Sequence, residues 1–130
     1  MVNRKRLMVF ILILFIVLIG SAIIVIIHNK SPDINTFSVS EYQYYIDNFP
    51  SEENMGKISD SNDLLNKVEA FWINKYGERI KSEKPFQVFY DEKNEIWFVR
   101  GTLRSGLLGG VANILVENST GRVLAVWRDK

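Results

Sequence analysis

The sequence contains no cysteine, so neither a disulfide nor a thiolate metal ligand can support its fold. It has one histidine, His28, which lies beside Asn29 and Lys30 and has no catalytic partner near it in the sequence. We interpret His28 as a polar residue at a membrane edge. Metal-binding patterns and phosphate-binding glycine loops are also missing, so we expect no catalytic residue, no cofactor and no metal site.

Charged side chains are absent from residues 7–27, most of which are aliphatic. At about 1.5 Å per residue, a helix of this length spans roughly 30 Å, the thickness of a bilayer's hydrocarbon core. Arg4, Lys5 and Arg6 precede the run and only Lys30 follows it closely, which places the N-terminus in the cytoplasm. The sequence therefore predicts a single-pass cell-membrane protein that contacts the lipid bilayer through residues 7–27 and has an extracytoplasmic C-terminal domain.

A cleaved signal peptide is the alternative interpretation of this run. Gly20, Ser21 and Ala22 provide the small residues that a cleavage site requires. The apolar residues continue over 23–27, beyond the length of an ordinary signal-peptide core, and this favours retention of the segment. The sequence does not decide between the two.

Residues 31–130 contain no excess of basic over acidic side chains. Residues 31–130 hold twelve basic and fifteen acidic residues, a net charge of −3. Proteins that bind nucleic acid present a basic surface, so we expect no nucleic-acid partner. We divide the chain into a membrane anchor with a short basic cytoplasmic end (1–28), a tether (29–37) and an extracytoplasmic domain (38–130).

Two helices are predicted at the start of this domain. Ser38 and Glu41 have the spacing of a capping box, and apolar residues follow at helical intervals up to Pro50. A longer helix begins near Asp60 or Ser61, either of which can cap it, and ends at Gly77. Its apolar stripe consists of Leu64, Leu65, Val68, Phe71, Trp72 and Tyr76, and we assign Trp72 to the core.

Alternating apolar residues after Pro85 predict four strands, over residues 86–90, 96–103, 111–117 and 122–128. Short turns join them, so they should form an antiparallel meander. The expected fold class is α+β, with an N-terminal transmembrane helix followed by a helix packed on a curved four-stranded antiparallel sheet.

Both faces of this predicted sheet are rich in apolar residues. One face would hold Phe86, Val88, Tyr90, Ile96, Phe98 and Arg100, and the other Gln87, Phe89, Trp97, Val99 and Leu103. The longer helix covers one face. The second is either an open partner surface or shallow pocket, or it is filled by the tether, the first helix and loops.

The segment between the second and third predicted strands has three glycines, Gly106, Gly109 and Gly110. They could mark a backbone that approaches a ligand, but they lack the lysine and the spacing of a phosphate-binding loop. We interpret them as a sharp turn or bulge that leads into the third strand.

Several short motifs resemble the nuclear-transport-factor-2-fold immunity proteins of bacterial polymorphic toxin systems. In chain order they are Tyr76-Gly77, Lys84-Pro85-Phe86, Trp97-x-Val99-x-Gly101-Thr102-Leu103, Gly109-Gly110-Val111 and Gly121-x-Val123-Leu124. The resemblance runs from about Ser61 to the C-terminus. It implies a cystatin-like or nuclear-transport-factor-2-like fold, no enzymatic activity, and a cognate toxin protein that is neutralised by steric blockade.

Three functions are thus in competition. The first is a membrane-anchored immunity protein. The second is an extracytoplasmic binding or sensor module, because the last predicted hairpin also resembles a PepSY domain. The third is a small pocket enzyme that uses Asp91 or Glu95 as its carboxylate. The sequence identifies neither the toxin, nor the partner-binding residues, nor the oligomeric state.

Overall fold

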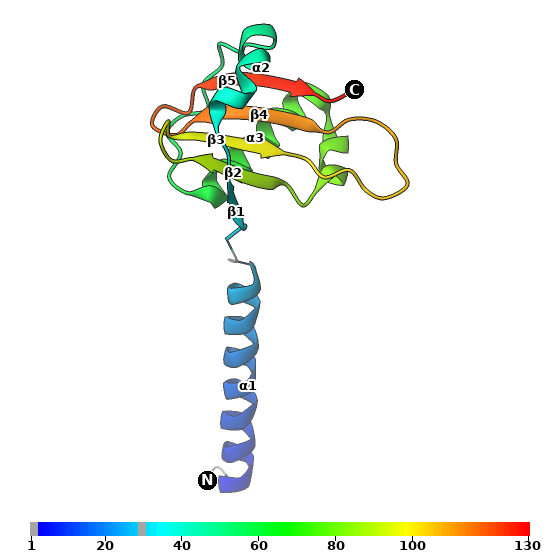
Figure 1. Ribbon diagram of the computed structural model, residues 1–130. Coiled ribbons are helices and arrows are strands. Elements are labelled where there is room, and N and C mark those ends of the chain that lie inside the picture. The colour runs from blue at the N-terminus through cyan, green and yellow to red at the C-terminus, as the bar shows by residue number, and fades with distance from the viewer. Residues whose placement is uncertain (1–2, 29–30) are drawn as a thin grey trace. The chain divides into compact units, whose positions relative to one another are not determined.

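Figure 1 shows the computed structural model of the chain, which describes residues 3–28 and 31–130. Side chains are described for residues 3–21 and 31–130. The chain divides into two compact units, Met1–Ser31 and Pro32–Lys130. Residues 29 and 30, where the predicted tether begins, lie outside the described residues.

Helix α1 (Arg4–His28) belongs to the first unit. Within the described residues, no helix combines the length and the apolar character that crossing a membrane requires. This finding overturns the predicted transmembrane helix, the lipid contact through residues 7–27 and the single-pass localisation. Residues 22–27 and the side chain of His28 lie outside the described side chains.

The second unit contains a five-stranded sheet in the order β1-β2-β3-β4-β5. The strands are β1 (Ile34–Thr36), β2 (Gln87–Asp91), β3 (Ile96–Arg100), β4 (Ala112–Glu117) and β5 (Val123–Arg128). The last four form the expected antiparallel meander, but β1 pairs in parallel with β2. The predicted four-stranded antiparallel sheet is therefore wrong, and the α+β fold contains a mixed sheet. Strand β1 is exposed at all three residues, so it has no apolar alternation by which the sequence could reveal it.

Helix α3 (Ser61–Tyr76) covers one face of the sheet and has the caps that the sequence predicts. The side chain of Asp60 accepts a hydrogen bond from the amide of Asp63 at 2.7 Å, and Gly77 follows the helix with φ +88°. Trp72 is fully buried and meets the ring of Phe86 edge-on, with 5.1 Å between centroids. The assignment of Trp72 to the core is confirmed.

The other face is covered by a short helical segment, η1 (Val39–Tyr42) followed by α2 (Gln43–Asn48), which lies opposite α3 in Figure 1. Tyr45 stacks on Trp127, with ring centroids 4.2 Å apart. Further apolar contacts come from Phe37, Val39, Tyr42 and Ile46, which pack against Ile96, Phe98, Leu115 and Ala125. Of the two alternatives for this face, the structure shows the one in which the first helical segment fills it.

The register of β2 and β3 corrects the predicted assignment of residues to faces. Val88 pairs with Val99, and Tyr90 pairs with Trp97. Residues directly opposite each other point to the same face, so Trp97 and Val99 lie under α3 while Ile96 and Phe98 lie on the opposite face. The predicted faces assume that side chains continue to alternate through residues 92–95. These residues form a turn, which shifts the alternation between one strand and the next.

Candidate functional site

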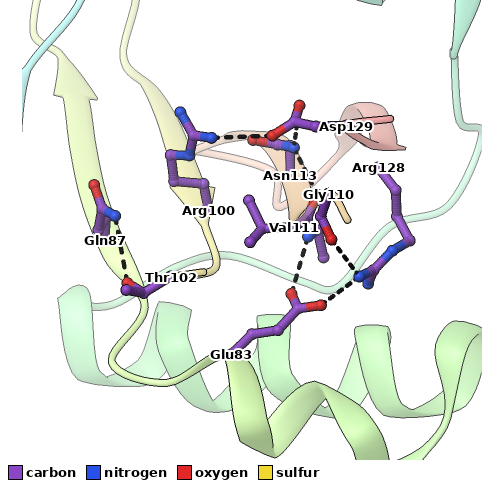
Figure 2. Close-up of polar contacts among 10 residues, drawn as sticks. Glu83, Gln87, Arg100, Thr102, Gly110, Val111, Asn113, Arg128 and Asp129 are labelled. Carbon is purple, nitrogen blue, oxygen red and sulfur yellow. Dashed lines mark hydrogen bonds and ion pairs between the residues drawn. The ribbon is translucent and has the colours of Figure 1, made fainter. Parts of the chain in front are cut away.

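Polar side chains from separate parts of the chain meet at the end of the sheet where β3 stops and β4 begins (Figure 2). Helix η2 (Glu78–Glu83) contributes to this region together with the loop of residues 101–111 and the C-terminal residues 128–130. We call these three segments the loop end. In Figure 1 the yellow-to-orange loop projects from the sheet at the same end as the C-terminus.

Glu83 is the centre of the polar network at the loop end. Its side chain is almost buried, and its Oε2 accepts a hydrogen bond from the amide of Ala112 at 2.9 Å. Its Oε1 accepts from Nη2 of Arg128, which also donates to the carbonyl oxygen of Gly110 at 2.7 Å. The Arg128 guanidinium lies 5.2 Å from the centroid of the Tyr76 ring. This charge-assisted network ties η2, the end of the loop and β5 together.

Two glycines allow these segments to approach each other. A Cβ at Gly101 would lie 2.5 Å from Oε2 of Glu83. A Cβ at Gly110 would lie 1.6 Å from the carbonyl oxygen of Asp129, which belongs to the backbone and cannot rotate away. The chain passes so close to itself at both positions that only glycine leaves enough room.

A second group of hydrogen bonds fixes the edge of the loop end nearest the C-terminus (Figure 2). Asp129 accepts from Nη2 of Arg100 and from Nδ2 of Asn113, both at 3.0 Å. The same Asn113 nitrogen donates to the carbonyl oxygen of Val111 at 3.0 Å. These hydrogen bonds hold the base of the loop in place, and among the described residues Nε of Arg100 is left buried without a partner.

The outer part of the loop is apolar and exposed. Leu103 is 48% exposed, Leu107 is 54% exposed, and Leu108 is fully exposed. The loop turns at Gly106 and Gly109, where φ is +81° and +115°, as the sequence analysis predicts for a sharp turn before the third predicted strand. Between the loop and η2 lies a cleft of about 170 Å³, whose lining includes Arg79, Ser82, Leu103, Arg104 and Leu108.

Replacing Arg104 by Ala should change the free energy of unfolding by less than about 0.5 kcal/mol, because this side chain is exposed and takes part in none of the described salt bridges. Urea unfolding followed by tryptophan fluorescence measures the effect. A loss above about 1 kcal/mol would show that Arg104 supports the fold.

Asp91 and Glu95, the carboxylates considered for a pocket enzyme, lie near the β2–β3 turn and away from the cleft lining. Asp91 is buried, and its Oδ2 accepts hydrogen bonds from the amide of Val39 at 2.8 Å and from Nδ2 of Asn94 at 2.9 Å. Its Oδ1 accepts from the amide of Asn94 at 3.0 Å. Asp91 thus fixes η1 to the β2–β3 turn, while Glu95 is exposed in that turn with φ +54°.

The pH dependence of stability should report this role of Asp91. The hydrogen bond from the amide of Val39, followed by those from Asn94, lowers the pKa of Asp91 below its ordinary value. A lowered folded-state pKa stabilises the protein above the unfolded-state pKa of about 4, and the contribution is lost as the pH falls through the folded-state value. We expect the urea concentration at the unfolding midpoint to decrease when the pH is lowered below about 4. In Asp91→Asn this decrease should be smaller than in the parent. An equal drop in both proteins would contradict this role.

The other candidates have structural roles. Trp97 donates its Nε1 hydrogen to Oδ1 of Asn118 at 2.8 Å, and the buried Trp127 stacks on Tyr45. In the described part of the chain, no three histidine, cysteine or acidic residues gather closely enough to hold a metal ion.

Comparison with known proteins identifies the family. A family model described as NTF2 fold immunity protein matches residues 66–130, which are half of the chain. The matched segment includes most of α3, all of η2 and the strands β2 to β5, and therefore the whole loop end. No curated protein and no solved structure matches the chain. The family match agrees with the order of motifs in the sequence and with a helix on a curved sheet: the chain belongs to the NTF2 fold immunity proteins.

Proposed function

We propose that the protein neutralises a cognate bacterial toxin by binding it stoichiometrically and blocking a surface that the toxin needs. Membership of an immunity protein family supports toxin neutralisation. The observation that carries the proposed mode of action is the loop end, where the Glu83–Arg128 pair fixes the base of the loop while three leucines remain exposed.

A catalytic alternative would need a group that is free to exchange a proton with a substrate. Glu83 and Asp91 are the buried carboxylates of the described residues, and hydrogen bonds from the protein occupy both. Burial raises the pKa of Tyr76, so its phenol stays neutral at pH 7. Each of these groups serves the fold, which favours a binding role over an enzymatic one.

The exposed leucines favour protein binding directly. Soluble proteins expose scattered apolar side chains, but a group of them on one projecting loop is typical of an interaction site. Burial of this loop against a partner would remove its apolar surface from water and stabilise the complex. A bound immunity protein of this size would cover the toxin surface around the contact and exclude its target.

Co-expression tests this proposal. The full chain is produced together with candidate toxin domains, taken from genes beside its own, and growth of the host is followed. We expect growth to be restored and the two proteins to co-purify in equal amounts. Val88→Asp, which places a charge in the core, is the unfolded control and should not protect. Continued toxicity beside folded parent protein would contradict the proposal.

A further inference from the structure

We infer that the toxin contacts the loop end and that its contacting surface is acidic with an apolar centre. This inference rests on the proposed function and adds to it the site and the chemistry of the partner. The surface consists of Arg79, Leu103, Arg104, Leu107 and Leu108, which we call the basic leucine patch.

The arginines of the second unit distinguish this patch. Three of its five arginines pair with carboxylates, at Arg100–Asp129, Arg122–Glu117 and Arg128–Glu83. The other two, Arg79 and Arg104, have no carboxylate within 4.0 Å among the described residues, and both line the cleft beside the loop. Glu83 also lines this cleft, but Arg128 compensates its charge. The patch is therefore locally positive on a part of the chain whose net charge is −3.

The apolar side chains of the patch occupy the same place. In the second unit the large apolar side chains that are exposed are Ile34, Tyr44, Phe49, Leu103, Leu107 and Leu108. Half of them belong to this one loop. The Glu83–Arg128 network holds the base of the loop, so the leucines extend from a fixed support and less conformational freedom is lost when a partner binds.

These features together define the chemistry of the partner. Exposed guanidinium groups bind carboxylates in bidentate geometry, and leucines require an apolar surface between those carboxylates. Nucleic acid is disfavoured, because the surrounding domain is acidic and would repel a phosphate backbone. A second copy of this chain is the other partner that could bind the patch, and the experiment distinguishes it from the toxin.

Association kinetics of the full chain with the toxin domain used in the co-expression test examine the inference at about 0.05 M and 0.5 M NaCl. Arg79→Glu/Arg104→Glu should lower the association rate constant about tenfold or more at low salt and remove most of its salt dependence. Leu107→Ala/Leu108→Ala should raise the dissociation rate constant about tenfold or more. Urea unfolding of each variant shows that it remains folded.

The matched control is Lys57→Glu/Lys93→Glu, which changes the net charge equally at two exposed lysines near the opposite end of the strands, neither of which takes part in a described salt bridge. It should alter both rate constants less than about threefold.

If the parent binds and both patch variants bind like it, the loop end is not the contact surface, although the proposed function survives. Equal losses in the patch variants and the control would also overturn the inference. If the parent forms a dimer and Leu107→Ala/Leu108→Ala is a monomer, the patch binds a second copy of this chain and not the toxin. A folded parent that does not bind the toxin domain overturns both proposals.

Discussion

Replacing Trp72 by Ala should lower the free energy of unfolding by about 3–5 kcal/mol. Trp72 is fully buried between α3 and the sheet, and its ring packs against Phe86, so truncation leaves a cavity in the middle of the core. A domain without disulfides has a total stability of about 5–15 kcal/mol, so this loss could remove most of it. Urea unfolding of the full chain, followed by the fluorescence of Trp97 and Trp127, measures the change.

Trp72→Phe provides the control for this prediction. The indole Nε1 of Trp72 is buried and has no hydrogen-bond partner in the described structure, so Phe removes an unpaired donor while it keeps most of the ring. We expect less than about half of the loss that Ala causes. If Trp72→Ala unfolds like the parent but no longer protects against the toxin, then α3 is an interface and the proposed orientation of the fold is inverted.

The second large effect is expected for Glu83→Ala, which leaves the guanidinium of Arg128 without its carboxylate. Removing one partner of a buried ion pair costs about 3–5 kcal/mol. Because the Arg128 side chain is 25% exposed, solvent compensates part of this, and we expect about 2–4 kcal/mol. The amide of Ala112 also loses its acceptor. Chemical unfolding of the variant and the parent at pH 7 gives the difference.

Glu83→Gln separates charge from hydrogen bonding at the same position. Glutamine keeps the volume and one acceptor oxygen, so the loss should be about 1–2 kcal/mol. A Glu83→Ala variant as stable as the parent would show that the carboxylate is not the group that holds η2 to β5. The loop end would then lack the rigid base on which the further inference depends.

The sequence predicted the parts of the fold that depend on local chemistry. Asp60 and Gly77 mark the ends of α3 because capping and a positive φ act within a few residues. The four C-terminal strands could be predicted because each is a short apolar segment bounded by turn or loop residues. Strand β1 could not, since its three exposed residues are held by pairing with β2, which is distant in sequence.

The candidate site was less accessible to sequence analysis, because its partners are far apart along the chain. Glu83 and Arg128 are separated by 45 residues, and nothing in their neighbourhoods indicates a pair. Helix η2 has no α-helical apolar period that could reveal it. The glycines of the loop gave the one local signal, and they predicted a turn without showing that the loop projects its leucines.

The apolar run near the N-terminus shows how a composition argument can extend too far. Its length and flanking charges suggested a membrane span over residues 7–27. Over the described residues, no helix meets the requirements for such a span.

Titration of a fixed amount of the toxin domain with the full chain tests the central claim, neutralisation by stoichiometric binding, most directly. Residual toxin activity is measured after each addition. Binding and blockade predict a linear loss of activity that ends near one molecule of this protein per toxin, and recovery of active toxin when the complex is separated. Inactivation of a large molar excess of toxin, or permanent inactivation after separation, would show that the protein acts catalytically and would contradict the account.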